Sequence, residues 1–255
     1  MGVNARTLGI RLLAVAGLIA GSTVSAGGET PRDPEPAPVA GEVFGYRAES
    51  SRFGRFGAGT MRVNGPENVR GVSAYRLTFE FKGRIGLFGI EDRTHSWIGA
   101  SSHASLRYEK RERSPLGSRR EEVEIFPEEQ RWNAANGLSG RTDCTRPLDE
   151  LSFIYHLRTL PLEVGAEYVL AHHYDAERNP VRVRVLGREE TQVPAGTFTT
   201  LVVEMTVRDE RLSDREATMR FHLSDDAARV PVLIESHARW VGTTRLLLES
   251  IGAQP

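Results

Sequence analysis

The chain has 255 residues, and its 33 lysines and arginines against 34 aspartates and glutamates give a formal net charge of −1. This near-neutral composition lacks the basic surface of a nucleic-acid-binding protein, so we expect no nucleic-acid partner. Cys144 is the only cysteine, which excludes a disulfide-stapled domain and leaves stability to a buried apolar core.

The first 26 residues have the three-part pattern of a secretory signal peptide. Arg6 and Arg11 precede an apolar run over residues 12–20, and Val24-Ser25-Ala26 resembles a cleavage site with small residues. The run is shorter than the roughly 20 residues that cross a bilayer as a helix. No cysteine directly follows the cleavage site, so we expect no lipid anchor. The sequence thus predicts a periplasmic or secreted protein that does not span the membrane once the signal is removed.

Residues 27–40 are predicted to form a linker, and residues 41–255 a single β-rich domain. Prolines among charged residues favour a stiff, extended spacer over a folded segment in the linker. Within the domain, alternation of apolar and polar residues predicts strands, most clearly in Tyr75-Arg-Leu77-Thr-Phe79-Glu-Phe81. The early strands are expected at residues 42–50, 59–63, 75–82, 102–111 and 121–126, with Gly65-Pro66 and Gly71 marking a turn.

Residues 149–160 break the alternating pattern and predict a helix of about three turns. Apolar residues at 151, 154 and 157 recur at the spacing of one helical face, and Pro161 ends the segment. Asp149 or Pro147 can begin the helix. Arg158 lies in its last turn, where a cation complements the helix dipole.

After this helix, six further strands are predicted, separated by short turns. They cover residues 166–174, 181–187, 197–208, 217–224, 231–239 and 243–249. Regularly spaced strands favour an antiparallel meander over alternating strands and helices. We therefore expect a mainly β fold, a single antiparallel, strongly curved sheet or open barrel with one packed helix near 149–160. A two-sheet β-sandwich is the alternative.

Several sequence pieces match an exported bacterial family in order and spacing. They are Gly41-Glu-Val-Phe-Gly-Tyr46, Asp149-Glu-Leu-Ser-Phe-Ile-Tyr-His-Leu-Arg158 followed by Pro161-Leu, Gly187-Arg-Glu-Glu, Val193-Pro-Ala-Gly-Thr-Phe198 and Leu223-Ser-Asp-Asp-Ala-Ala-Arg-Val-Pro231-Val. Over roughly residues 41–250 the chain resembles the family called domain of unknown function 3108 (DUF3108). Phe221-His222 and residues 112–146 depart from the family pattern. As the family's name says, the resemblance implies no activity, cofactor or catalytic residue.

The residues from His172 to Asp175 come nearest to a metal-ligand set. In a strand, the imidazoles of His172 and His173 would point to opposite faces, whereas His173 and Asp175 would share one. A third ligand would have to come from elsewhere, the candidates being His156, His222 and His237. Polar residues at a strand end are the commoner explanation of this pattern. We therefore expect no metal and no other cofactor.

The sequence carries no catalytic signature, and we expect no enzymatic activity. Cys144, next to Asp143, could act as a thiolate nucleophile if a histidine lay near it, but a loop cysteine without a flanking signature is more often incidental. The strand carboxylates Glu80, Glu122 and Glu124 alternate with apolar neighbours, so they should face outward rather than into a cleft. The motifs of a nucleophile elbow and of a phosphate-binding loop are absent from the sequence.

Residues 83–99 combine glycines with apolar side chains and leave two interpretations open. One is a pair of strands with a glycine-permitted bend. The other is a mobile apolar edge that lines a ligand cavity or docks a partner. For that second interpretation, the candidate ligand-binding residues are Leu87, Phe88, Ile90 and Trp97.

Three functions are open to an exported β domain without a reactive cluster. The first is a non-enzymatic binding module of the cell envelope that holds an apolar ligand, such as a lipid, or an envelope protein. The second is a structural or assembly protein that pairs an exposed sheet edge with another chain. The third is a metal-dependent enzyme with His173 and Asp175 among its ligands. Of the three, the sequence favours the binding module.

Overall fold

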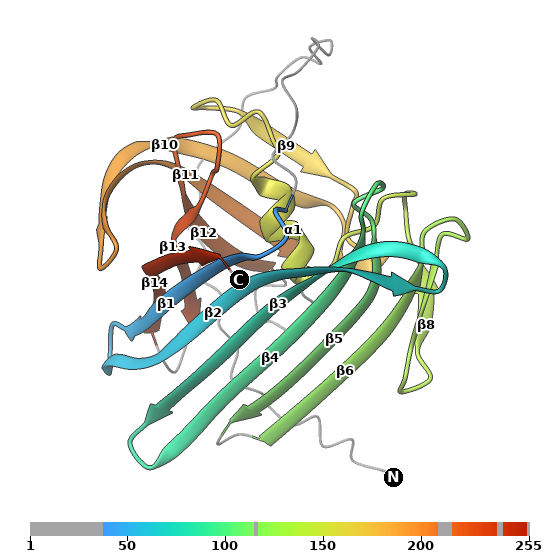
Figure 1. Cartoon of the computed structure of the whole chain (residues 1–255), viewed down its shortest axis with the longest axis horizontal. Helices are drawn as coiled ribbons and strands as arrows, with labels where there is room; N and C mark the ends of the chain where they lie inside the picture. Colours follow the sequence, from blue (N-terminus) through green and yellow to red (C-terminus); the bar gives the residue numbers. More distant parts are fainter. Residues whose placement is uncertain (1–37, 115–116, 209–215, 239–241, 254–255) are drawn as a thin grey trace.

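A computed structural model describes residues 38–114, 117–208, 216–238 and 242–253. The expected signal peptide and residues 27–37 of the expected linker lie outside these ranges. The described residues form one antiparallel sheet of 14 strands, which curls into an open barrel around a single α-helix (Figure 1). The expected single curved sheet is thus confirmed, and the two-sheet sandwich is wrong.

The strands follow one another along the sheet in chain order, with a single exception at its centre. There β1 pairs with β14, so the beginning and the end of the domain lie side by side, and β8 and β9 become the two edges. The strands are β1 (Glu42–Ser50), β2 (Gly54–Val69), β3 (Val72–Ile85), β4 (Phe88–Gly99), β5 (Ser105–Ser114), β6 (Gly117–Phe126), β7 (Arg131–Ala134), β8 (Ser139–Arg141), β9 (Glu167–Leu170), β10 (Val181–Val193), β11 (Gly196–Arg208), β12 (Glu216–Ser224), β13 (Pro231–Ala238) and β14 (Gly242–Ala253).

Every strand expected from alternation is present, most of them with shifted ends. The turn expected at Gly65-Pro66 is wrong, because β2 continues through this dipeptide with a bulge and turns only at Arg70-Gly71. A bulge lets the pairing continue around a proline, which lacks the N–H donor of a regular ladder. Strands β7 and β8 were not expected, since three or four residues are too few to establish an alternating pattern.

The helix α1 (Glu150–Leu157) is shorter than the expected range 149–160. Asp149 is its N-cap and accepts hydrogen bonds from two backbone N–H groups of the first turn. At the other end, the N–H groups of Thr159 and Leu160 donate to carbonyls three residues back, and Pro161 has no N–H with which to continue the helix. These two effects end the helix before the proline.

The main core lies on the concave face of the curled sheet, around α1. Large side chains from α1 and from strands on both sides of it are fully buried, among them Tyr46, Phe153, Phe221 and Leu248. Burying an apolar side chain of this size contributes about 1.5–3 kcal/mol. Since α1 lies inside the curled sheet (Figure 1), the buried side chains of the helix and the strands fill this part of the interior.

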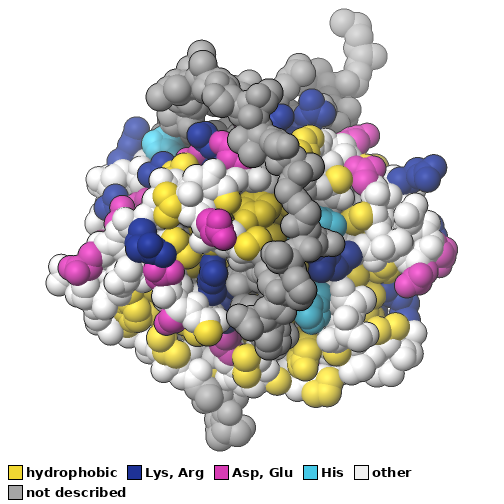
Figure 2. Space-filling view, turned by 90° about the horizontal axis from the view of Figure 1, so that it is seen from above, with side chains coloured by type: hydrophobic (Ala, Val, Ile, Leu, Met, Phe, Trp, Pro, Cys, Tyr) yellow, Lys and Arg dark blue, Asp and Glu magenta, His cyan; other side chains and the backbone are white. Residues whose placement is uncertain are grey.

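Seen from above, the molecule carries charged side chains of both signs among hydrophobic ones (Figure 2). Neither sign gathers into one area of this face, as is usual for an ordinary solvated surface. Within the described ranges, no helix has the length and apolar character needed to cross a bilayer.

Candidate functional site

The expected metal-ligand residues do not form a common site. His172 and His173 lie beyond the end of β9, so the strand geometry assumed for them is wrong. Nδ1 of His173 accepts a hydrogen bond from the backbone N–H of Asp175 at 3.0 Å, and the Asp175 carboxylate caps a short 3-10 helix. Both side chains therefore bond to the local backbone. Among the residues that the structure describes, no three His, Cys, Asp or Glu side chains are grouped to hold a metal ion.

Cys144 does lie beside a histidine. Its Sγ is 3.4 Å from Nδ1 of His172. Burial raises the pKa of the Cys144 thiol, whereas burial together with Arg146 lowers the pKa of His172. At neutral pH the pair is therefore a protonated thiol beside a neutral imidazole, which is the less nucleophilic form of a cysteine. Asp143 bonds to an asparagine side chain and does not orient the imidazole.

Residues 83–99 form the β3–β4 hairpin, so their interpretation as a pair of strands is confirmed. Leu87 and Phe88 lie at the tip of this hairpin and are exposed, and the half-buried Ile90 follows them on β4. Trp97 lies toward the other end of β4, where it is buried and its Nε1 donates to Glu67. The four candidate residues are therefore not brought together.

The sequence pieces that carry the family resemblance meet inside the molecule. Arg158, one residue beyond α1, forms a two-point ion pair with Glu42 of β1, with N–O distances of 2.6 and 2.8 Å. The same guanidinium donates to the carbonyl of Ala228, and the Tyr46 hydroxyl donates to the carbonyl of Pro231. Only 3% of the Arg158 side chain is exposed. These contacts hold α1 to the sheet and are closed to a ligand, so we assign them to folding.

The beginning of α1 is anchored in a similar way. A carboxylate oxygen of Asp149 accepts hydrogen bonds from the hydroxyls of Ser96 on β4 and Ser105 on β5, at 2.5 and 2.6 Å. Burial raises the pKa of Asp149 to about 6, although the serine hydrogen bonds oppose this change. Every oxygen of the carboxyl group has donors, so this group too serves the fold.

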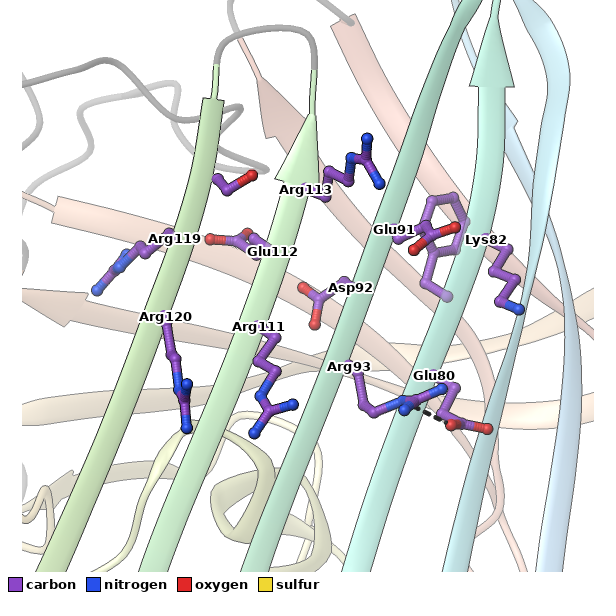
Figure 3. A pocket seen from close by; sticks show the side chains of 12 residues that line it. Glu80, Lys82, Glu91, Asp92, Arg93, Arg111, Glu112, Arg113, Arg119 and Arg120 are labelled. Carbon is purple, nitrogen blue, oxygen red and sulfur yellow. Dashed lines mark ion pairs between the residues drawn. The ribbon is translucent and has the colours of Figure 1, made fainter.

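A hollow of different character lies along the ends of β3–β6 that are near the hairpin turns. It has a volume of about 440 Å³, and charged side chains line most of it (Figure 3). Six are cations and four are carboxylates, namely Lys82, Arg93, Arg111, Arg113, Arg119 and Arg120, with Glu80, Glu91, Asp92 and Glu112. We call this hollow the charged pocket.

Three arginines of the charged pocket stand side by side on neighbouring strands. Arg93 of β4 pairs in register with Arg111 of β5, and Arg111 with Arg120 of β6 (Figure 3). They lie on the outer face, because Ser96 has the opposite parity on β4 and reaches inward to the cap of α1. We call these three residues the arginine row. Like charges directly opposite one another in a sheet disfavour folding, so packing alone does not explain the row.

Carboxylates offset only part of this repulsion. Glu80 lies 2.9 Å from the first arginine of the row, and Glu122 pairs with the other two. These carboxylates and Glu124 lie on the outer face in ion pairs, as their alternation predicted, but Glu80 also lines the charged pocket, so the expectation that it would face no cleft is wrong.

The three arginine side chains are still 53%, 57% and 64% exposed. Glu109 lies on the same face beside Arg93 and Arg111, but among the described residues it forms no ion pair with them. Three cations are thus ion-paired with two carboxylates, and one of these, Glu80, is shared with Arg62, so an anionic group can still pair with the row.

On the inner face of the sheet, behind the arginine row, the cation Lys110 is paired with two carboxylates. Lys110 lies 3.1 Å from Asp92 and 3.6 Å from Glu112. Burial by itself lowers the pKa of Lys110, but the two carboxylates more than reverse this and hold the pKa above its ordinary value. The inner cation is thus paired twice, and Arg119, which lies on the same face, is paired with Glu121. The cations without a matching number of ion-paired carboxylates are those of the row on the outer face.

The charged pocket suits recognition of a carboxylate or phosphate group rather than a covalent step. Guanidinium groups bind such anions through paired N–H donors and do not give up a proton near neutral pH. The sequence interpretation missed the pocket, because the residues of the arginine row are distant in the chain and each occupies an ordinary outward position. Only the pairing register of the predicted strands could have shown that these three arginines lie side by side.

The chain matches the sequence profile of the family described as "Protein of unknown function (DUF3108)" over residues 44–249. The comparison with curated proteins gives no match. Among solved structures, the chain is similar to a β-barrel-like protein of the domain of unknown function DUF1849 from Brucella abortus. The TM-score is 0.56 and the identity 11%, covering 87% of this chain and 99% of that chain. A likeness at this identity supports the fold alone.

Two further solved structures match more loosely. One is described as an exported protein with a YmcC-like fold from Bacteroides fragilis, with a TM-score of 0.32, 10% identity and coverage of 85% of this chain and 98% of that chain. The other is described as a lipoprotein from Parabacteroides distasonis, with a TM-score of 0.33, 12% identity and coverage of 86% and 100%. Neither superposition is close enough to carry an argument.

Proposed function

The chain belongs to the DUF3108 family, and from that premise we propose that it is a non-enzymatic binding module of the cell envelope. The export part of this proposal rests on residues 1–26, which have the composition of a signal peptide. The binding part rests on one observation, the arginine row with its three exposed cations ion-paired with two carboxylates. Its ligand is an anionic group on a partner.

Of the two occupants expected from the sequence, an envelope protein is better supported than a buried apolar ligand. The interior around α1 is filled by side chains such as Tyr46, Phe153 and Phe221, which leaves little room for a lipid there. The charged pocket is open but charged, and burying charge against an apolar ligand is unfavourable. Carboxylates on a protein partner can instead pair with the arginines.

Photo-crosslinking in the intact envelope tests this proposal. A photoreactive residue in place of Ser118, which lines the charged pocket, is expected to trap an envelope protein. The same residue in place of Val169, exposed on the edge strand β9, is expected not to trap it. Replacing Arg111 and Arg120 with glutamine should abolish the crosslink from position 118. An equal yield from both positions would refute a specific site.

The sheet edge at β6 is the second candidate site, and a specific observation favours it. In the described residues, β7 pairs only with the part of β6 from Val123 to Phe126, so the first half of β6 has no strand on that side. Arg119, Arg120 and Glu121 lie on this open half, and such charges protect an edge from indiscriminate pairing. A crosslink from position 118 that survives the loss of the arginine row would favour this edge over the row.

Two measurements address the remaining alternatives. Native mass spectrometry of the protein taken from its own compartment should find no bound lipid, and a stoichiometric lipid would restore the apolar-ligand hypothesis. Elemental analysis of the same sample should find no metal. A bound metal lost in the Asp175→Ala variant would restore the hypothesis of a metal-dependent enzyme.

A further inference from the structure

The β3–β4 hairpin ends in an apolar tip that the described residues leave uncovered. Its two-residue loop is Gly86-Leu87, and the first position takes a φ of +59°, as glycine allows in a tight hairpin. Leu87 is 90% exposed, the highest value among the large hydrophobic side chains described, and Phe88 is 60% exposed. The hairpin reaches beyond the neighbouring β1–β2 turn, which carries the exposed Phe53 (Figure 1).

Three exposed cations lie just behind this tip. Lys82 and Arg84 precede it on β3, and Arg113 lies on β5 next to the hairpin. Within the described part of the chain, none of the three has a carboxylate within the 4.0 Å of an ion pair. Glu91 stands between Lys82 and Arg113 in register, so the group of four keeps a net positive charge.

Several exposed arginines elsewhere on the sheet are paired instead. On β10, Arg182 lies 3.9 Å from Glu216 and Arg184 lies 3.1 Å from Glu167. On β14, an arginine is paired with a carboxylate of β13 at 2.6 Å. Arg141 and Arg208 are also exposed without an ion pair in the described residues, so the distinctive feature of the β3–β4 hairpin is that three such cations lie behind an exposed apolar tip.

We propose that this tip docks the protein on an anionic membrane surface. Leu87 and Phe88 enter the headgroup region, while Lys82, Arg84 and Arg113 contact lipid phosphates. Peripheral binding of this kind combines the burial of apolar side chains with attraction to anionic lipids, and both components are present in one tip. A second copy of the chain fits less well, because two tips that met would bring their cations together.

This inference rests on the export proposed above, which places the protein beside the membranes of the envelope. The apolar residues of the tip, Leu87 and Phe88, are separate from the arginine row, although Lys82 and Arg113 also line the charged pocket. The two sites can therefore fail independently.

Sedimentation with lipid vesicles tests the inference. We expect the exported protein to bind vesicles of phosphatidylcholine mixed with phosphatidylglycerol, and high salt to weaken this binding. The double variant Leu87→Asp, Phe88→Asp should lower the partition coefficient at least roughly tenfold, because each apolar side chain leaves the bilayer. Replacing Lys82, Arg84 and Arg113 with glutamine should lower it roughly fivefold for each charge.

Matched variants elsewhere on the sheet serve as controls. Val169→Asp removes an exposed apolar side chain from β9, and Arg182→Gln with Arg184→Gln removes two exposed cations from β10. Both should bind vesicles as the wild type does, with β-sheet circular dichroism unchanged in every variant. The Leu87→Asp, Phe88→Asp variant should also keep the crosslink from position 118, so failure of the membrane tip and failure of the protein partner remain distinguishable.

Three outcomes would overturn the inference. The first is a wild-type protein that does not bind the mixed vesicles. The second is equal binding by the Leu87→Asp, Phe88→Asp variant. The third is a dimer in solution that this variant dissociates, because a second copy would then cover the tip.

Discussion

The interior around α1 and the charged pocket belong to one sheet, yet their charged side chains differ in burial and in pairing. In the interior, the side chains of Arg158 and Asp149 are buried, and every polar atom of these two side chains has a hydrogen-bond partner. In the charged pocket, the arginine row is more than half exposed and is ion-paired with fewer carboxylates than it has cations. A buried charge without a partner costs several kcal/mol, whereas an exposed excess costs little. The comparison shows that the residues typical of the family mark the fold, while the surface available to a partner lies elsewhere.

Arg158→Ala tests the interior side of this comparison most severely. The change leaves the largely buried Glu42 carboxylate without its partner, so we expect a loss of about 3 to 5 kcal/mol in the free energy of unfolding. Urea denaturation followed by circular dichroism measures this loss. The double variant Arg158→Met, Glu42→Leu removes both charges and should lose clearly less. Equal losses would show that the ion pair does not hold the helix.

Asp149→Ala tests the other anchor of α1. Two serine hydroxyls and two backbone N–H groups lose their acceptor, and we expect a loss of about 2 to 4 kcal/mol in the free energy of unfolding. Asp149→Asn is the matched control, because its amide oxygen can still cap the helix, and it should lose less. The same urea measurement decides, and an alanine variant as stable as the asparagine variant would contradict the assignment.

The pH dependence of stability gives a sharper test of the same carboxyl. Its folded-state pKa of about 6 lies above the ordinary value of 3.8, so the folded protein binds this proton more tightly than the unfolded chain does. The resulting stabilisation is complete below about pH 4 and is lost as the pH rises to about 6. The difference in unfolding free energy between wild type and Asp149→Asn across this range isolates the effect. A difference independent of pH would contradict the raised pKa.

Substitutions in the arginine row should affect partner binding and leave stability almost unchanged, unlike substitutions in the interior. Replacing Arg111 and Arg120 with glutamine should change the free energy of unfolding by less than about 0.5 kcal/mol, because both side chains are exposed. The crosslink to an envelope partner should nevertheless be lost. Arg182→Gln with Arg184→Gln carries the same change of charge and should leave the crosslink intact. A large loss of stability in the row variant would assign the row to folding as well.

The smallest expected effect concerns the reactivity of the Cys144 thiol. Because burial raises the pKa of its thiol, alkylation by iodoacetamide should be slower at pH 7 than for a free cysteine and should speed up as the pH rises. Alkylation rates measured over a pH series check this expectation. Rapid alkylation at pH 7 would show that His172 activates the thiol and would reopen the hypothesis of a cysteine nucleophile.

Much of the fold could be predicted from local pattern, and the departures have physical causes. The strand from Glu42 to Ser50 was predicted to the residue, because from Phe44 onward every second side chain faces the core. The bulge at Gly65-Pro66 was read as a turn, since proline and glycine mark both features in a sequence. The strand expected over residues 166–174 ends at Leu170, because the segment from His172 onward bonds to Leu148 and to its own turn.

The sequence by itself determined that this chain is a DUF3108 protein whose strands have an inner and an outer face. Alternation and helical spacing are properties of neighbouring residues, so they can be read along the chain. Only the tertiary structure decided where the positive charge gathers. The arginine row depends on the register of β4, β5 and β6, and the isolation of the apolar tip depends on how far β3 and β4 extend beyond their neighbours. Both are relations between distant parts of the chain, and hydrogen bonding across the sheet sets them.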